Sequence, residues 1–165
     1  MKKVIVFALL AVIGVYLTGR VSLGESGAMR FIMEMDSLMN EGKADEVCAM
    51  FHDDLEFSIV DHTSTDGGST TIEGGKQDFC NTTRAQVAAL QKVPHTMSVD
   101  FKEVTVKRSW LHPWTSEISY TEDRTFTIRG ANVRLNTTSD DNITLVQTLS
   151  GVKLLRVRVE AWMAE

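Results

Sequence analysis

The sequence lacks the short motifs that mark several common enzyme classes. It has no Gly-x-Ser-x-Gly nucleophile elbow, and its paired glycines, Gly67-Gly68 and Gly74-Gly75, do not continue into a phosphate-binding spacing. It also has no His-x-x-x-His pair and no close cysteine pair, the usual start of a zinc site. We therefore predict no metal and no cofactor.

The chain is also short of positive charge. It has 17 Lys and Arg against 22 Asp and Glu, and three of the bases (Lys2, Lys3 and Arg20) lie in its first twenty residues. The remainder carries 17 − 3 = 14 bases and a net charge of 14 − 22 = −8. An acidic domain without a basic stripe is a poor binder of nucleic acid, so we predict no nucleic-acid partner.

Long apolar runs are absent except at the N-terminus. Lys2 and Lys3 precede an apolar run from Val4 to Leu17, which is the layout of a secretory signal. The run is short for a membrane span, which needs about 20 apolar residues. Small residues at Ser22-Leu23-Gly24 offer a cleavage site.

We predict that residues 1–24 are a signal peptide or an N-terminal anchor in the inner membrane. Residues 25–165 then form one exported, periplasmic domain, and residues 4–19 are its membrane contact.

Cysteine is scarce, with only Cys48 and Cys80. In an oxidising compartment the two can pair, closing a loop of about thirty residues and adding on the order of 3–4 kcal/mol of stability. The alternative is two buried thiols on separate helices. We predict the disulfide if the domain is exported and the two helices pack together.

Hydrophobic periodicity predicts three helices in the first ninety residues. Apolar residues recur at helical spacing from Ser26 to about Glu41, again from about Ala44 to Phe51, and from Lys76 to Leu90. Between the last two, Leu55, Phe57, Ile59 and Asp61 alternate along one face of a strand, and Thr71-Ile72 is at most a short strand.

In the rest of the chain, apolar residues alternate with polar ones, which is the period of two typical of β-strands. One long strand changes parity between Phe101 and Val104, which is typical of a bulge. A second long strand follows, in which Ile118, Tyr120 and Phe126 share a face. Residues 130–142 are predicted to be a polar loop, and a final hairpin turns near Ser150-Gly151.

This order of elements resembles the nuclear transport factor 2-like superfamily, which includes ketosteroid isomerase and scytalone dehydratase. The resemblance covers roughly residues 28–163. It rests on three stretches: NEGKADEVCAMFHDDLEF at 40–57, IEGGKQDF at 72–79 and SGVKLLRVRVEAW at 150–162. It implies an α+β fold, in which a cone-shaped, strongly curved antiparallel sheet packs against three N-terminal helices. By the same resemblance, a homodimer is expected.

The resemblance also implies a catalytic position. In the isomerases of the superfamily a carboxylate near the end of the first strand acts as a base inside an apolar cone, and Ile59 falls at that position here. Asp61 lies two residues further on the same face and is the candidate base, with Tyr120 as the candidate hydrogen-bond donor. The alternative is that Asp61 only caps the end of the strand.

The candidate ligand contacts lie around the expected cone, and all of them except Asp61 are apolar or aromatic. They are Phe57, Ile59, Asp61, Trp110 and Trp114. The polar set His52, Asp53, Asp61 and His62 is interpreted as a solvated corner rather than a metal site, because it alternates between a helix end and both strand faces.

Three functions follow, in order of preference. The first is a non-catalytic module that binds a small apolar ligand or an envelope protein. The second is an isomerase or dehydratase with Asp61 as base. The third is a membrane-anchored structural subunit of an envelope assembly.

Overall fold

The computed structural model describes residues 23–63, 68–108, 112–130 and 133–164. They contain three helices and one six-stranded sheet. The helices are α2 (Glu25–Asn40), α3 (Ala44–Ala49) and α4 (Lys76–Leu90). The strands are β1 (Phe51–Asp61), β2 (Thr70–Gly75), β3 (His95–Arg108), β4 (Thr115–Ile128), β5 (Val133–Thr148) and β6 (Gly151–Met163). The predicted α+β class and three helices are confirmed.

The strands lie in the order β2-β1-β6-β5-β4-β3. All neighbours are antiparallel except β1 and β6, which run parallel, so the sheet is mixed rather than wholly antiparallel. Almost the whole domain separates β1 from β6 in sequence, and no short turn forces them to run in opposite directions.

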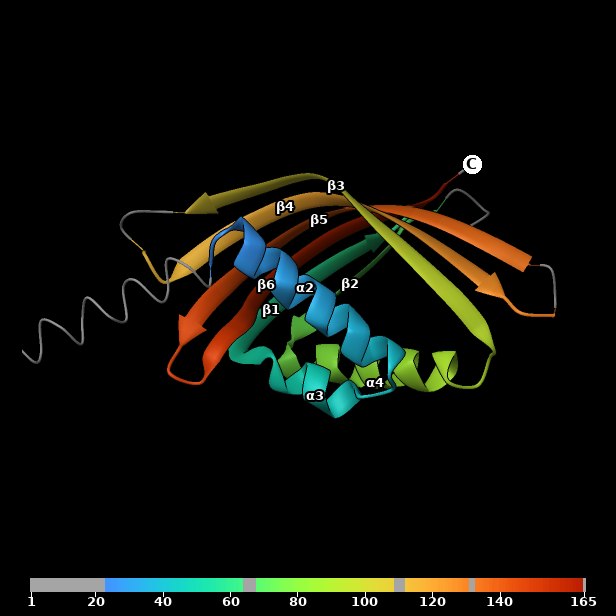
Figure 1. The fold of residues 1–165 in the computed structure, drawn as a ribbon, viewed down its shortest axis with the longest axis horizontal. Coiled ribbons are helices and arrows are strands. Elements are labelled where there is room, and N and C mark those ends of the chain that lie inside the picture. The colour runs from blue at the N-terminus through green and yellow to red at the C-terminus, as the bar shows by residue number, and fades with distance from the viewer. Residues whose placement is uncertain (1–22, 64–67, 109–111, 131–132, 165) are drawn as a thin grey trace, which may run out of the picture.

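The sheet curves over the helices. Figure 1 shows the long strands arching above α3 and α4, with α2 crossing in front. In β3 the pairing with β4 shifts register between Lys102 and Thr105, and Glu103 there has a φ of 52°. The bulge predicted from the change of parity is therefore confirmed, and a bulge bends and twists the strand that contains it.

Two sequence assignments were wrong. Residues 133–142, predicted as a loop, belong to β5 and pair with β4 from Val133 opposite Ile128 to Asn142 opposite Ser119. Their polar side chains suggested a loop, but those on the inner face line a partly polar cavity instead of meeting water. Phe51, predicted at the end of the second helix, is the first residue of β1.

The core lies between the concave face of the sheet and the helices. Its buried side chains come from every helix and from the four central strands. The largest fully buried ones are Phe51, Leu23, Ile118, Leu145, Leu154 and Val47.

Leu23 lies at the edge of the predicted leader, whose residues 1–22 fall outside the described part of the chain. Leu23 is fully buried and belongs to the core cluster. Cleavage after Gly24 would therefore remove a core side chain. Within the described residues, no helix is long and apolar enough to cross a membrane.

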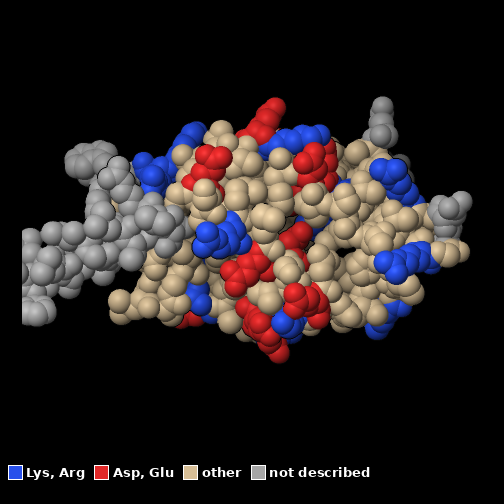
Figure 2. Space-filling model, in the orientation of Figure 1, with Lys and Arg blue, Asp and Glu red and all other residues tan. Residues whose placement is uncertain are grey.

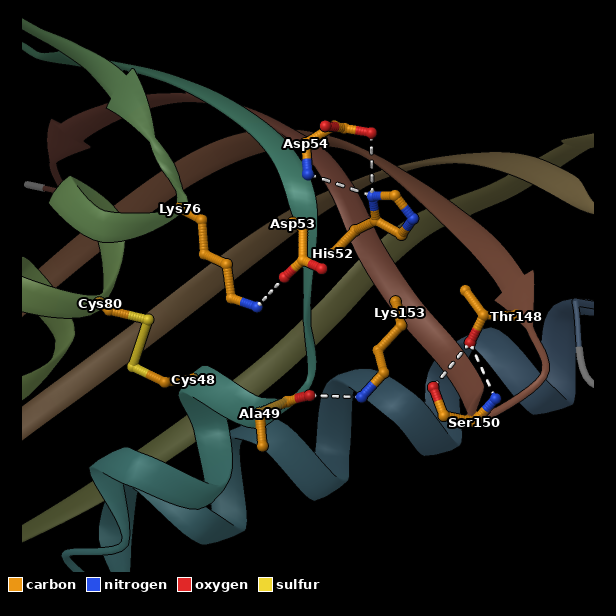
Figure 3. Close-up of polar contacts among 10 residues, drawn as sticks. All are labelled: Cys48, Ala49, His52, Asp53, Asp54, Lys76, Cys80, Thr148, Ser150 and Lys153. Carbon is orange, nitrogen blue, oxygen red and sulfur yellow. Dashed lines mark hydrogen bonds and ion pairs between the residues drawn. A yellow bond between two sulfur atoms is a disulfide. The ribbon is translucent and has the colours of Figure 1, made fainter.

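The acidic corner at the start of β1 is a solvated ion-pair site. Asp53 Oδ1 lies 2.7 Å from Lys76 Nζ, and His52 Nδ1 accepts a hydrogen bond of 3.2 Å from the backbone N–H of Asp54 (Figure 3). Both aspartate side chains are almost fully exposed. Among the residues described, no three His, Cys, Asp or Glu side chains are grouped so that they could hold a metal ion.

A disulfide joins Cys48 of α3 to Cys80 of α4, with 5.4 Å between their Cα atoms and a sequence separation of 32 (Figure 3). The predicted pairing is confirmed. Lys153 of β6 also donates a hydrogen bond to the carbonyl of Ala49, at the end of α3. The disulfide thus holds α3 to α4, and the Lys153 hydrogen bond holds the end of α3 to the sheet.

Replacing Cys48 and Cys80 together with alanine is expected to lower the free energy of unfolding by about 3–4 kcal/mol, because the unfolded chain regains the entropy that the closed loop removes. Urea denaturation of oxidised wild type and the double variant measures the difference. A reducing agent should destabilise wild type and leave the double variant unchanged. Equal stability of oxidised and reduced wild type would contradict this role.

Candidate functional site

A cavity of about 330 Å³ lies inside the cone, between the concave face of the sheet and helices α2 and α4. Its apolar wall includes Met35 and Met39 of α2, Phe79 of α4 and Val159 of β6. Most of its charged and polar lining comes from β4 and β5, and β1 and α4 add Asp61 and neutral groups such as Thr83. The cavity therefore offers an apolar space with a limited set of polar groups, as small-molecule sites do.

The polar wall arises from the pairing of β4 with β5. Residues opposite each other in the ladder share a face, and four successive inward pairs are Ile118–Ile143, Tyr120–Asp141, Glu122–Ser139 and Arg124–Thr137. The inner face thus changes from apolar to polar within a few residues. Tyr120 and Asp141 stand at the boundary, and the side chain of each is 7% exposed.

Arg124 is the counter-ion of two carboxylates. Its guanidinium lies 2.6 Å from Glu122 Oε1 and 3.4 Å from Asp36 Oδ1 of α2. Burial raises the pKa of both acids, and the positive charge of Arg124 opposes that rise. This triad of Asp36, Glu122 and Arg124 links α2 to the sheet beside the cavity.

Asp141 has a hydroxyl partner but no cation of its own among the described residues. Ser139 Oγ donates a hydrogen bond of 3.0 Å to its Oδ2. Burial raises the pKa of Asp141 to about 7, and the negative charge of Glu122 adds to that rise. At neutral pH this carboxyl group is therefore present in both its protonated and its ionised form.

Tyr120 presents a hydroxyl group without a hydrogen-bond partner among the described residues, although its ring packs edge-on against Phe101 with 5.5 Å between centroids. Burial raises the pKa of Tyr120 well above its usual value, so the hydroxyl keeps its proton. Because the side chain lines the cavity, the hydroxyl can donate to, or accept from, a molecule inside it.

Asp61 and Tyr120 both line the cavity, but they lie on strands β1 and β4, three places apart in the sheet. At the usual strand spacing this separates their backbones by roughly 14 Å. Asp61 Oδ1 accepts a hydrogen bond of 2.8 Å from the backbone N–H of Thr63. Hydrogen bonds from Thr63 hold the pKa of Asp61 below its usual value, so it is a weaker base than a buried carboxylate.

The other predicted ligand contacts are spread over the molecule. Ile59 lines the cavity. Phe57 is buried beside it and packs on Phe79, with 4.9 Å between ring centroids. Trp114 is 52% exposed next to the turn before β4 and is not part of the cavity wall, and Trp110 lies outside the described residues.

Sequence reasoning missed Asp141, Glu122, Arg124 and Asp36. Asp141 was hidden by the assignment of residues 130–142 to a loop. The period-two series Thr137, Ser139, Asp141 and Ile143 was the available signal, since it continues directly into the strand recognised from Ile143 onward.

Replacement of Asp141 with asparagine is expected to change how stability depends on pH. The folded-state pKa of Asp141 (about 7) lies above the usual value of 3.8, so the folded state binds more protons between these values and its stability falls as pH rises through them. Ionisation of Asp141 in the folded protein lowers the free energy of unfolding by at most about 4 kcal/mol.

The free energy of unfolding of Asp141→Asn, relative to that of wild type, should therefore rise by up to about 4 kcal/mol from pH 4 to pH 8. Urea denaturation at each pH measures it. Asp140→Asn is the matched control, because Asp140 lies on the outer face of the same strand and accepts a hydrogen bond from Thr121. A pH-independent gap between wild type and Asp141→Asn would show that Asp141 is ionised in the folded protein across this range.

No protein-family model and no curated protein sequence matches the chain. Solved structures do match it. A putative scytalone dehydratase from Novosphingobium aromaticivorans has a TM-score of 0.62 and 10% identity, over 90% of this chain and 89% of the other. The β subunit of the benzoate 1,2-dioxygenase from Burkholderia mallei has a TM-score of 0.66 and 10% identity, over 84% and 91%.

An NTF2-like protein with a cystatin-like fold, also from Novosphingobium aromaticivorans, has a TM-score of 0.61 and 15% identity, over 87% of this chain and 86% of the other. At such identities the likeness concerns the fold alone. The chain therefore has the cystatin-like fold of the nuclear transport factor 2-like superfamily, as the sequence resemblance implied.

Proposed function

We propose that the cone binds a small, mainly apolar molecule that carries one polar group. The observation that supports this most directly is Tyr120, whose side chain is largely buried, lines the cavity next to Asp141 and makes no hydrogen bond within the described part of the chain. A ligand that bonds to its hydroxyl group gains a hydrogen bond in a place that little water reaches.

A second candidate is proton transfer, as in an isomerase or dehydratase. It is favoured by the raised pKa of Asp141, about 7, because an acid or base works best when its pKa lies near the working pH. Tyr120 would donate a hydrogen bond to a developing oxyanion. In this version Asp141 is the stronger candidate base, and Asp61 remains the alternative at the other side of the cavity.

The bicyclic ketone 2-tetralone tests both candidates, because it has an apolar body, one carbonyl acceptor and exchangeable α-protons. We expect it to bind in the cone, and Tyr120→Phe should weaken binding about 5–10-fold by removing one hydrogen-bond donor. Isothermal titration calorimetry measures the affinity, and Ser119→Ala, on the outer face of β4, is the matched control.

Deuterium incorporation into bound 2-tetralone, followed by NMR, separates the two candidates. Exchange above the buffer rate that disappears in Asp141→Asn supports proton transfer, whereas exchange at the buffer rate leaves a binding module. If 2-tetralone and compounds with the same bicyclic skeleton fail to bind, or bind wild type and Tyr120→Phe equally well, the cavity is not the ligand-binding site.

We also propose that the domain is exported and that Leu23 stays attached to it. The leader-like residues 1–20 and the Cys48–Cys80 disulfide support export, because disulfides persist in oxidising compartments. The full burial of Leu23 favours an uncleaved anchor, or cleavage before Leu23.

Intact-mass spectrometry of the protein from membrane and soluble envelope fractions should find a chain that begins at or before Leu23. A folded mature chain beginning at Glu25 would contradict this. Native spectra of the same samples show whether the homodimer expected from the resemblance, or an envelope partner, is present.

A further inference from the structure

The inner wall of the cone carries an excess of acidic groups. Asp61, Glu122 and Asp141 line the cavity, and Asp36 lies behind Glu122. Arg124 is the one basic side chain among the described lining residues, and α4 contributes only neutral polar groups, such as Thr83 and Gln86.

The partners of these carboxylates leave one of them uncompensated. Arg124 contacts both Glu122 and Asp36, so the triad has a net charge of −1 when both acids are ionised. Asp61 is held by the backbone N–H of Thr63. Asp141 accepts a hydrogen bond from the neutral Ser139 hydroxyl, and its neighbours Glu122 and Asp140 are acids as well. The positive charge of Arg124 also acts on Asp141, but Arg124 makes its ion pairs with Glu122 and Asp36.

A second, independent observation concerns Tyr120. Its side chain is largely buried and lines the same cavity, and the residue stands directly opposite Asp141 in the β4–β5 ladder. A phenol oxygen can accept a hydrogen bond from a positively charged donor while its own proton points elsewhere. Tyr120 and Asp141 together therefore offer two oxygen acceptors beside an apolar space.

We propose that the cavity binds a small organic cation, with a protonated primary amine between Asp141 and Tyr120 and an apolar body against Met35, Met39 and Phe79. This inference rests on the proposed function and names its ligand class. The ammonium group supplies the counter-charge that Asp141 lacks, and it forms charge-assisted hydrogen bonds.

Other charge classes fit less well. An anionic ligand would face the three carboxyl groups that line the cavity, and the one guanidinium there is already paired with Glu122 and Asp36. A neutral acceptor can bond to Tyr120, but only the protonated form of Asp141 can donate to it. The acidic exterior also favours a cation: Figure 2 shows Asp and Glu side chains gathered over the middle of the face formed by α2 and α3, and such a field attracts cations to the surface.

Three compounds with the same bicyclic skeleton test the charge preference: 2-aminotetralin, 2-tetralone and tetralin-2-carboxylate. Calorimetry at pH 8 should show the amine binding at least tenfold tighter than the ketone, and the carboxylate weakest. From pH 6 to pH 8 the affinity for the amine should rise about tenfold as Asp141 ionises, while the affinity for the ketone falls.

Asp141→Asn should remove the preference for the amine, and Asp140→Asn should keep it. A further measurement needs only wild type, so it tests the proposal even if Asp141→Asn does not fold. At pH 7, titrations in two buffers of different ionisation enthalpy should show that amine binding releases about half a proton.

An amine that binds no tighter than the ketone, or equally well to Asp141→Asn, overturns the charge assignment while leaving cavity binding intact. Failure of all three compounds to bind overturns the proposed function itself.

Discussion

The register of β4 against β5 is the constraint on which the candidate site depends. Because opposed residues share a face, this one alignment places Tyr120 beside Asp141, Glu122 beside Ser139 and Ile118 beside Ile143. A slip of β5 by one residue would turn its inward side chains, Asp141 among them, to the outer face. The main-chain hydrogen bonds between these two long strands thus decide which of their side chains line the cavity.

Placing acids on the inner face of a sheet works against the stability of the fold. Asp36, Glu122 and Asp141 all have a raised pKa for the same reason, since burial disfavours their ionised forms. Arg124 offsets the cost for two of them, and nothing comparable offsets it for Asp141. The disulfide between α3 and α4 acts on the helices that close the cavity, so its stabilisation helps the domain to tolerate an unfavourable group in its interior.

The elements that the sequence revealed were those with a regular pattern or a special residue. The parity change between Phe101 and Val104 located the β3 bulge, and the Gly-Gly-Lys stretch located the start of α4. The structure adds the reason for a glycine there, since a Cβ on Gly74 would lie 2.9 Å from the ring of Phe57. The site was less visible. Hydrophobic pattern alone does not distinguish a polar strand facing a cavity from a polar loop facing water, so Asp141 fell into a predicted loop. Arg124 and Asp36 are 88 residues apart, and only the fold brings them together.

Asp61 and Asp141 show how one fold gives two carboxyl groups different chemistry. Asp61 ends a strand beside a backbone N–H that stabilises its charge, and its pKa is lowered. Asp141 is buried and has the acidic Glu122 as a neighbour, and its pKa is raised to about 7. In the cavity, therefore, Asp141 can change its charge state at neutral pH in response to what binds. Any molecule that enters the cone selects one form of this group, a cation the ionised form and a neutral acceptor the protonated form. The binding that we propose therefore depends on the charge of the ligand as well as on the shape of the cavity.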